Sequence, residues 1–312
     1  MPINELLTIM KPLWGIDLGG TKIEGVVIES AEHPNVLARL RVPTEQSGGY
    51  QHIIGQIQKL IGMLESATGL KPERIGIGTP GSIDPPTQLL KNCNTTALNG
   101  QPLNRDLEAA LGIPVLMAND ANCFAVAEAR FGAVRRKVPN AQVVFGVILG
   151  TGVGGGVVVN GKVINGLQGI GGEWGHNFLH ESGGMCYCGR IGCVETVISG
   201  PALERYYAKQ AGAKVKLAEI VARDYAGEDP VAAQTLSRLL EYWGKAIAYV
   251  INILDPDAIV IGGGVGNIDL LYSEEGLAQV KKHVFNPRLD TPFLKPELGD
   301  SAGVFGAALL AE

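Results

Sequence analysis

Residues 13–29, LWGIDLGGTKIEGVVIE, decide the fold of this 312-residue chain. Leu13 to Leu18 and Ile23 to Glu29 are apolar enough to form strands, and the Gly-Gly-Thr-Lys between them is typical of a tight turn. Residues 143–159, VVFGVILGTGVGGGVVV, repeat this arrangement of strand, glycine-rich turn and strand. Helical segments follow each copy. The sequence therefore predicts an α/β protein with two similar lobes around a cleft.

The boundary between the lobes is expected near Asn119, where a predicted strand ends. The last helix, Ser301 to Ala311, is expected to return to the first lobe. The small N-terminal lobe would then contain residues 1–118 and 299–312, and the large lobe residues 119–298. Two lobes suit the length, because chains beyond about 250 residues usually form more than one core.

Composition excludes two classes of function. The formal net charge is −5, and the basic cluster Arg135-Arg136-Lys137 is more typical of a solvated surface loop than of a nucleic-acid interface. No run of about 18 apolar residues is present, so no membrane span is expected. Met1 to Leu13 is too short and mixed for a signal peptide. We expect a cytoplasmic protein that binds small molecules.

Three of the five cysteines, Cys186, Cys188 and Cys193, lie within eight residues, and His176 lies just upstream. A Cys3His set fills the tetrahedral shell of a structural zinc ion. We therefore predict a closed zinc site at these four residues, with His180 as a rival fourth ligand. Three free thiols, or a disulfide with one thiol left over, are the alternatives, and the odd number of cysteines disfavours a disulfide framework.

The glycine-rich turns do not match the best-known nucleotide motifs. Gly150-x-Gly152-x-x-Gly155 is the dinucleotide pattern, but a predicted strand follows it where that motif requires a helix. Neither Gly161-Lys162 nor Gly244-Lys245 is followed by the Ser or Thr of a Walker A loop. Backbone N–H groups of hairpin turns can also bind anions. The two turns are therefore predicted to bind phosphate, with simple tight turns as the alternative.

Three further segments could contribute to such a site. Asp17, beside the first turn, suits a magnesium ion, either directly or through water. Gly262-Gly263-Gly264 ends a late strand, where a nucleotide base or ribose could rest against bare backbone. Asn119-Asp120 precedes a helix and could be its N-cap. Alternatively, Asp120 could accept the proton of an attacking hydroxyl while the turns and metal stabilise a transferred phosphoryl group.

Together these motifs resemble those of the ROK family (repressors, unassigned frames, sugar kinases), which has the actin-like ATPase (ribonuclease H-like) fold. The resemblance covers almost the whole chain. Asp17 to Lys22 is similar to the first phosphate motif of the family, and Leu149 to Gly156 to the second. Asn119 to Cys123 is similar to the catalytic segment. Glu173-Trp-Gly-His with Cys186 to Glu195 is similar to the zinc signature, which is the most specific of these motifs.

The resemblance implies a role for each matching residue. Asp120 would be the general base, and the pocket for the sugar hydroxyls would be formed by Asn119, Glu173, His176 and Glu195, closed by Gly81, Ser82 and Asn94. His176 would both bind zinc and touch the sugar. The nucleotide would be bound by Gly19, Gly20, Thr21, Lys22, Gly150, Thr151, Gly152, Gly154, Gly155, Gly263 and Gly264, with Asp17 at the magnesium ion.

The implied activity is ATP-dependent phosphorylation of a hexose hydroxyl, with Mg²⁺ on the nucleotide and a structural Zn²⁺. Lys91 to Leu103, together with Glu173-Trp-Gly-His-Asn and Glu195-Thr-Val-Ile-Ser-Gly, resembles the bacterial fructokinases and mannokinases. We therefore expect fructose or mannose, with glucokinase or N-acetyl-hexosamine kinase as alternatives. A sugar-sensing transcriptional regulator and an inactive scaffold are alternatives of other classes. The retained Asp120 favours a kinase, and a first strand near Leu13 leaves no room for the helix-turn-helix of the family's repressors. A homodimer is also implied.

Overall fold

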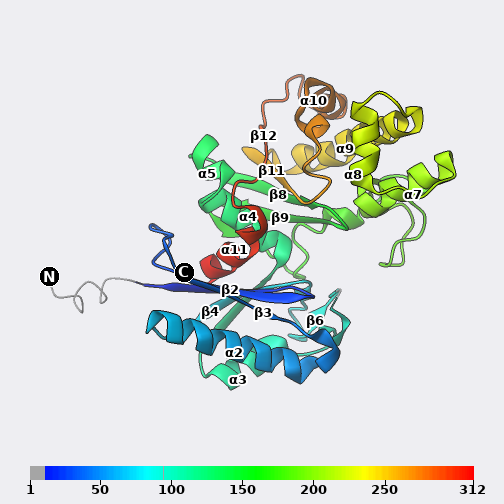
Figure 1. Cartoon of the computed structure of the whole chain (residues 1–312). Coiled ribbons are helices and arrows are strands. Elements are labelled where there is room, and N and C mark those ends of the chain that lie inside the picture. The colour runs from blue at the N-terminus through cyan, green and yellow to red at the C-terminus, as the bar shows by residue number, and fades with distance from the viewer. Residues whose placement is uncertain (1–10, 94) are drawn as a thin grey trace. The chain divides into compact units, whose positions relative to one another are not determined.

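The computed structural model describes residues 11–93 and 95–312, which divide into two compact units (Figure 1). The first unit contains the described residues up to Gly132 together with Lys162–Gly171 and Leu298–Glu312. The second unit contains Ala133–Gly161 and Gly172–Glu297. Asn94, which was predicted to help close the sugar pocket, lies outside the described residues.

The first unit is built on a five-stranded sheet of order β3-β2-β1-β4-β7. The first two strands form the predicted hairpin, and β4 and β7 run parallel to β1. A short separate hairpin, β5–β6, follows β4. The strands of the unit are β1 (Leu13–Leu18), β2 (Lys22–Ile28), β3 (Val36–Pro43), β4 (Ile75–Thr79), β5 (Ser82–Ile83), β6 (Leu90–Lys91), β7 (Val115–Asn119) and β10 (Lys162–Val163).

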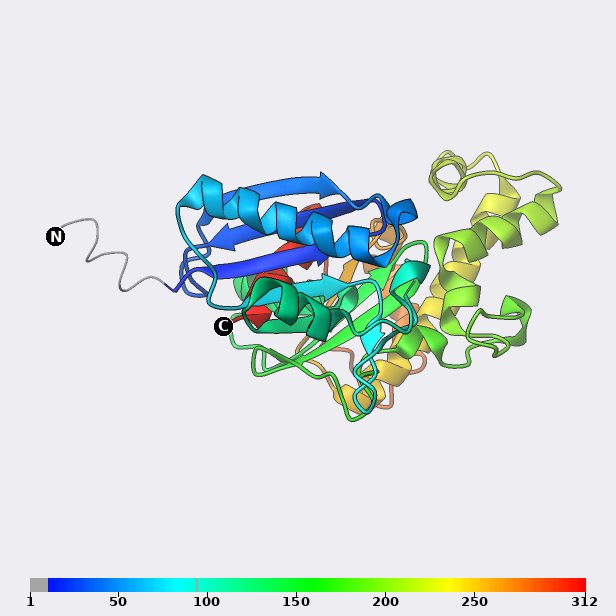
Figure 2. The same ribbon diagram turned by 90° about the horizontal axis from the view of Figure 1, so that it is seen from below.

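Helices cover both faces of this sheet: α2 and α3 lie on one face, and α4 and α11 on the other (Figure 1). Figure 2 shows α2 extended along the sheet. This helix has an apolar stripe whose residues Ile53, Ile57, Leu60, Ile61 and Leu64 are all buried. The helices are η1 (Gln46–Gly48), α2 (Tyr50–Thr68), η2 (Thr96–Leu98), α3 (Leu103–Leu111), α4 (Asp120–Arg130), η6 (Gly299–Ser301) and α11 (Ala302–Leu310).

Helix α11 packs very closely on β4. A Cβ atom added to Gly76 would lie 1.8 Å from the carbonyl oxygen of Ala307, so only glycine fits there. Helix α11 also packs against α4, which therefore belongs to the first core. For this reason the boundary between the units follows α4, at Gly132, and differs from the expected boundary near Asn119.

The second unit repeats the topology of the first. Its strands follow the order β9-β8-β11-β12, which corresponds to β2-β1-β4-β7. An antiparallel hairpin joins β8 to β9, and β11 runs parallel to β8. A strand thus follows the second glycine turn, as predicted, which excludes the dinucleotide motif. The strands are β8 (Val143–Leu149), β9 (Val153–Val159), β11 (Ala258–Gly262) and β12 (Phe293–Leu294).

The longest helix among the described residues is α9 (Pro230–Leu254). Asp229 caps it by accepting from the N–H groups of Val231 and Ala232, and Pro230 occupies its first turn. Its buried face packs against β8 and β11 in one apolar cluster. The other helices of the unit are α5 (Ala133–Lys137), η3 (Trp174–His176), η4 (Glu181–Gly183), α6 (Val194–Ile198), α7 (Gly200–Ala211), α8 (Leu217–Tyr225), η5 (Asp269–Tyr272) and α10 (Glu274–Lys281).

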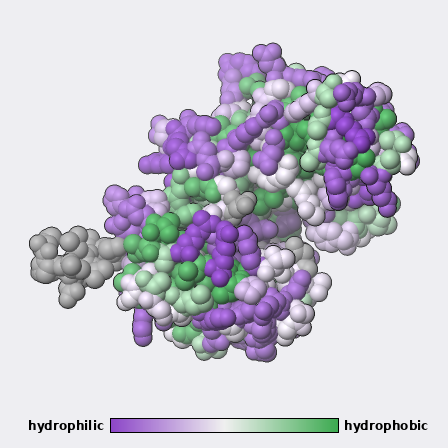
Figure 3. Space-filling view, in the orientation of Figure 1, coloured by the Kyte–Doolittle hydropathy of each residue, from purple (hydrophilic) through white to green (hydrophobic). Residues whose placement is uncertain are grey.

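The basic cluster at residues 135–137 forms the end of α5, not the loop that was expected. Arg136 and Lys137 both pair with Glu297, and the Lys137 Nζ atom lies 3.3 Å from its carboxylate. Hydrophilic side chains spread over the visible face of the molecule, with smaller hydrophobic areas between them (Figure 3). Within the described residues, no helix has the length and apolar character needed to cross a membrane.

Candidate functional site

Polar side chains gather at one edge of the first unit's sheet. The parallel register places Asp17 of β1 opposite Gly78 of β4, and Thr79 of β4 opposite Asn119 of β7. The carboxyl ends of these three strands therefore lie side by side. In open α/β sheets, ligands bind outside the carboxyl ends of parallel strands. This edge is thus the first candidate site.

Asn119 and Asp120 have separate roles at the start of α4. The Asn119 Oδ1 atom accepts a hydrogen bond of 2.7 Å from the Asn122 N–H, so Asn119 is the N-cap. Asp120 is the first residue of the helix, and its Oδ1 atom accepts from the Ala121 N–H at 2.8 Å. The positive end of the helix dipole favours an ionised carboxylate at this position. The capping interpretation is therefore confirmed for Asn119 and is compatible with a catalytic Asp120.

Asp17 lies close enough to Asp120 for the two charges to interact. Burial, followed by the charges of Asp120 and Glu24, raises the pKa of Asp17 to about 6, although Lys22 acts in the opposite direction. Two carboxylates in one partly buried place repel each other, and a divalent cation would relieve that repulsion. Asp17 could therefore bind magnesium, as predicted from its place beside the first turn.

The first glycine turn is closed by a hydrogen bond of 3.0 Å from the Gly19 N–H to the Lys22 carbonyl. Thr44 fixes this turn from the side. Its hydroxyl donates to the Gly19 carbonyl at 2.7 Å, and its N–H donates to the Thr21 carbonyl at 3.0 Å. Thr44 is fully buried. Sequence reasoning missed this residue, because it follows a strand and belongs to no recognisable motif.

The second glycine turn is closed by a hydrogen bond of 2.9 Å from the Gly150 N–H to the Gly152 carbonyl. Beside it, the Glu195 carboxylate accepts from the Val153 N–H at 3.0 Å. Thr151 lies in the turn and is exposed. Gly154 and Gly155 were predicted as part of the phosphate loop. They lie within β9, opposite Ile148 and Val147, so the turn itself is shorter than expected.

Gly263 and Gly264 follow β11, next to the end of β8. The Val265 N–H donates to the Leu149 carbonyl at 2.9 Å, which holds this segment beside the second turn. Glu173 precedes the short helix η3, and the indole N–H of the next residue, Trp174, donates to the Gly154 carbonyl at 3.0 Å. The segment that begins at Glu173 is therefore anchored to the hairpin of the second turn.

The predicted metal ligands come together in the second unit. One ligand atom each from His176, Cys186, Cys188 and Cys193 lies within 4.8 Å of the others. The Cys186 Sγ–His176 Nδ1 distance is 3.6 Å, and the Cys188 Sγ–Cys193 Sγ distance is 3.5 Å. Tetrahedral zinc bonds of about 2.0–2.3 Å would place the ligand atoms about 3.5–3.8 Å apart. These four residues could therefore hold a zinc ion, and all five cysteines are free of disulfides.

The two histidines of this segment differ in position. The His176 Nδ1 atom faces the cysteines, and its Nε2 atom lies 2.9 Å from the Tyr187 hydroxyl. The His180 Nδ1 atom is instead 2.7 Å from the Ser182 hydroxyl, and His180 is not part of the metal-ligand group. His176 is therefore the better fourth ligand.

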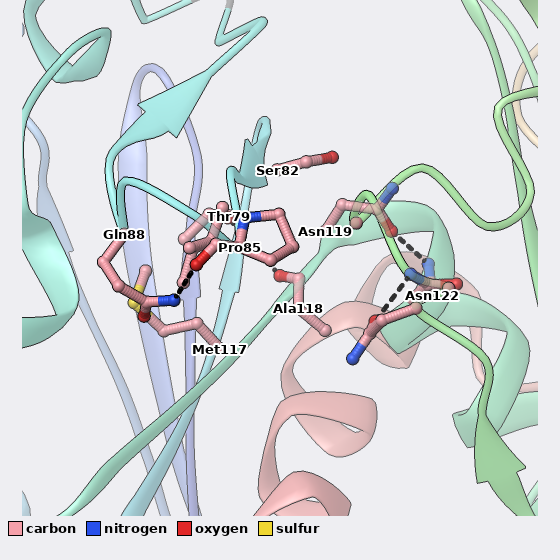
Figure 4. Close-up of a pocket in the computed structure, with 12 residues that line it drawn as sticks. Thr79, Ser82, Pro85, Gln88, Met117, Ala118, Asn119 and Asn122 are labelled. Atoms are coloured by element: carbon pink, nitrogen blue, oxygen red, sulfur yellow. Dashed lines mark hydrogen bonds between the residues drawn. The ribbon is translucent and has the colours of Figure 1, made fainter.

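A pocket of about 150 Å³ opens in the first unit beside Asn119 (Figure 4). Ser82, which was predicted to bind sugar, also lines it, whereas Gly81 is not among the lining residues. Asn122 and Asn165 line the pocket as well, and sequence reasoning missed both. Asn122 lies within the quoted catalytic motif, but Asn165 lies in a glycine-rich loop that offers no recognisable signal.

The sequence comparisons place this geometry in a family. A model described as the ROK family matches residues 13–312. An N-acetyl-D-glucosamine kinase from Aliivibrio salmonicida is 36% identical over 308 residues, covering 95% of this chain and 98% of the relative. An N-acetyl-D-glucosamine kinase from Pasteurella multocida is 35% identical over 309 residues, with the same coverage.

Comparison with solved structures supports the same family. A ROK hexokinase from Thermus thermophilus has a TM-score of 0.86 at 33% identity and covers 96% of this chain and 97% of its own. A ROK family glucokinase from Streptomyces griseus, in complex with glucose and AMPPNP, has a TM-score of 0.75 at 29% identity, with 96% and 99% coverage. The predicted actin-like ATPase fold is thereby confirmed. The chain belongs to the ROK family.

Proposed function

We propose that the chain is an ATP-dependent sugar kinase whose acceptor is a hydroxyl of N-acetylglucosamine. The observation that carries the kinase assignment is Asp120, a carboxylate at the N-terminus of α4 and beside the carboxyl ends of three parallel strands. The names of the curated relatives support the choice of sugar, since they are N-acetyl-D-glucosamine kinases that match over almost their whole length.

This choice corrects the expectation of fructose or mannose. That expectation depended on the resemblance of residues 91–103, 173–177 and 195–200, and the first of these segments includes the undescribed Asn94. The relatives favour the alternative, an N-acetyl-hexosamine. The hydroxyl-binding residues are shared among hexose kinases of the family, so they could not separate these sugars.

In the proposed reaction, Asp120 accepts the proton of the sugar hydroxyl. The hydroxyl oxygen forms a bond to the γ-phosphorus of ATP as the bond between that phosphorus and the ADP oxygen breaks. Asn119 holds Asp120 at the helix start through its own capping bond. The N–H groups of the two glycine turns bind phosphate oxygens. Magnesium, when bound with Asp17 nearby, would neutralise charge on the phosphates.

The zinc site would have a structural role. A Cys3His shell leaves no position for a reactive water molecule. The same segment carries Glu173 and Glu195, which we propose as sugar ligands with His176. Contact with a sugar through the His176 Nε2 atom would replace its present partner, the Tyr187 hydroxyl. Neither the zinc ion nor the homodimer expected from the family is tested by these observations, and both stay predictions.

A coupled ADP-release assay with single sugars tests the proposed function. We expect the largest kcat/KM for N-acetylglucosamine among N-acetylglucosamine, N-acetylmannosamine, glucose, mannose and fructose. A ROK family transcriptional regulator has a TM-score of 0.80 with this chain at 25% identity, although this chain covers 77% of it. If no sugar stimulates ADP release but sugars still bind, the regulator would be the better assignment.

A further inference from the structure

The pocket beside Asn119 has a preformed outer wall. This wall is the segment Lys162–Gly171, which we call the strap. The Lys91 Nζ atom donates to the Gln168 carbonyl at 3.2 Å and pairs with Asp84 at 2.8 Å. Gly169 has a φ of 67°, and a Cβ atom there would lie 2.5 Å from the Ile83 carbonyl oxygen. The strap is therefore fixed closely against the β5–β6 hairpin.

The lining of the pocket is uncharged and combines polar with apolar groups. None of its described lining residues carries a charge at neutral pH. An ionic ligand would lose its hydration there without gaining a partner of opposite charge, so the pocket favours a neutral group. The polar groups are amides and hydroxyls, including Ser82, Asn119 and Asn165, and they alternate with the apolar side chains of Ile83 and Met117.

Asn165 gives the pocket a directed hydrogen-bond donor. The Asn122 Nδ2 atom donates to the Asn165 Oδ1 atom at 3.4 Å, which orients the Asn165 amide. With its oxygen engaged in this way, Asn165 can offer its Nδ2 group to a carbonyl oxygen. The Ser82 hydroxyl can accept from an amide N–H, and the apolar side chains can contact a methyl group. These are the three requirements of an acetamido substituent.

We propose that this pocket receives the N-acyl group of the amino sugar and that it accepts acyl chains longer than acetyl. The inference rests on the proposed function and specifies which part of the substrate this site recognises. Asn119 lines the pocket and directly precedes Asp120, the proposed base, in the chain. A water molecule needs about 10–15 Å³ of such volume. A pocket of about 150 Å³ therefore has room beyond the four heavy atoms of an acetamido group.

The test measures KM and kcat for N-acetyl-, N-propanoyl- and N-butanoyl-glucosamine. For the wild-type protein, we expect kcat/KM of the first two sugars to agree within about threefold. Asn165→Trp, which fills the pocket from the strap, should raise KM for N-acetylglucosamine by at least about tenfold and abolish use of the longer chains, with KM for ATP unchanged. Asn165→Ala, which removes only the donor, should raise KM about two- to tenfold, as expected for one hydrogen bond.

Leu167→Trp is the matched control. Leu167 lies in the same strap, is 92% exposed and does not line the pocket, so this variant should behave as the wild type. The inference is overturned if the wild type uses N-acetylglucosamine but rejects N-propanoylglucosamine, or if Asn165→Trp leaves KM for the sugar unchanged. An equal rise in KM for ATP and for the sugar in Asn165→Trp would also overturn the inference. A wild-type protein inactive on N-acetylglucosamine would refute the proposed function itself.

Discussion

The two glycine hairpins share a topology but differ in the residues that surround their turns. In the first hairpin, Asp17 lies two residues before the turn; at the corresponding position of the second hairpin lies Ile148. The first turn is held by a neutral residue, Thr44, through two hydrogen bonds. The second turn is held by a carboxylate, Glu195, from the segment that carries the candidate metal ligands.

This difference suggests that the two hairpins have different chemical roles although their topology is the same. The first hairpin lies beside two interacting carboxylates, Asp17 and Asp120, which suits proton transfer and cation binding. Strand β8 of the second hairpin carries no carboxylate. The carboxylate beside this hairpin is Glu195, which comes from a different segment and accepts from the Val153 N–H. The repeated supersecondary unit therefore provides the same backbone in both hairpins. We propose that differences at corresponding positions, such as Asp17 and Ile148, determine the chemical role of each hairpin.

The largest expected effect is the loss of the base. Asp120→Asn keeps the size and the hydrogen-bonding shape of the side chain but cannot accept the hydroxyl proton. We expect kcat to fall by roughly 10²–10⁴, the usual contribution of a positioned general base. The affinity for an ATP analogue, measured by titration calorimetry, should change little. Near-normal turnover in this variant would mean that Asp120 is not the general base.

The second effect concerns the metal segment. Cys188→Ser removes one of four zinc ligands, so we expect metal analysis to fall from about one zinc per chain to almost none. Because the same segment carries His176 and Glu195, the proposed sugar ligands, KM for the sugar should rise by roughly tenfold, as expected when a hydrogen bond to the substrate is lost. A zinc-free variant with an unchanged KM for the sugar would separate the metal from substrate binding.

The third effect compares Glu195 and Thr44, the residues that hydrogen-bond to the second and the first glycine turn. Glu195→Ala removes a charged acceptor from the Val153 N–H and should weaken binding of an ATP analogue by about tenfold. Thr44→Val removes only the neutral hydroxyl bond to Gly19 and should weaken binding by about threefold. Calorimetry with the analogue, in the absence of sugar, measures both. If Thr44→Val weakened binding of the analogue more than Glu195→Ala does, the hydrogen bond to Glu195 would not be the more important of the two.

The smallest effect is a pH dependence of stability that arises at Asp17. Its folded-state pKa of about 6 exceeds the ordinary value of 3.8, so folding favours the protonated form. This group therefore reduces stability as pH rises from about 4 to about 6, and the loss persists above that range. Without nucleotide or magnesium, Asp17→Asn should raise Tm at pH 8 by a few degrees and by less at pH 4. An equal change at both pH values would contradict this assignment.

The sequence predicted those features that depend on local pattern. Both hairpins and the Cys3His spacing follow from periodicity or from the chemistry of a single short segment. Features that depend on tertiary packing were missed. Helix α4 joins the first core only because α11, far away in the sequence, packs against it. Thr44 and Asn165 have no local signal, since each acts on a partner more than 20 residues away.

The choice of sugar was hard to predict for the same reason. The residues that bind hydroxyls form recognisable motifs, but the shape of a pocket depends on segments that converge only in the folded chain. Residues between Ser82 and Gln88, the end of β7 and the strap form this pocket together. No single one of these segments indicates an N-acyl group.

A competition experiment tests the central claim most directly. The protein, ATP and Mg²⁺ are incubated with equal concentrations of N-acetylglucosamine, glucose, mannose and fructose, and mass spectrometry quantifies the sugar phosphates at low conversion. The account predicts that N-acetylglucosamine phosphate predominates and that Asp120→Asn forms almost none of it. A predominance of fructose phosphate or mannose phosphate, or equal product from the Asp120 variant, would contradict the account.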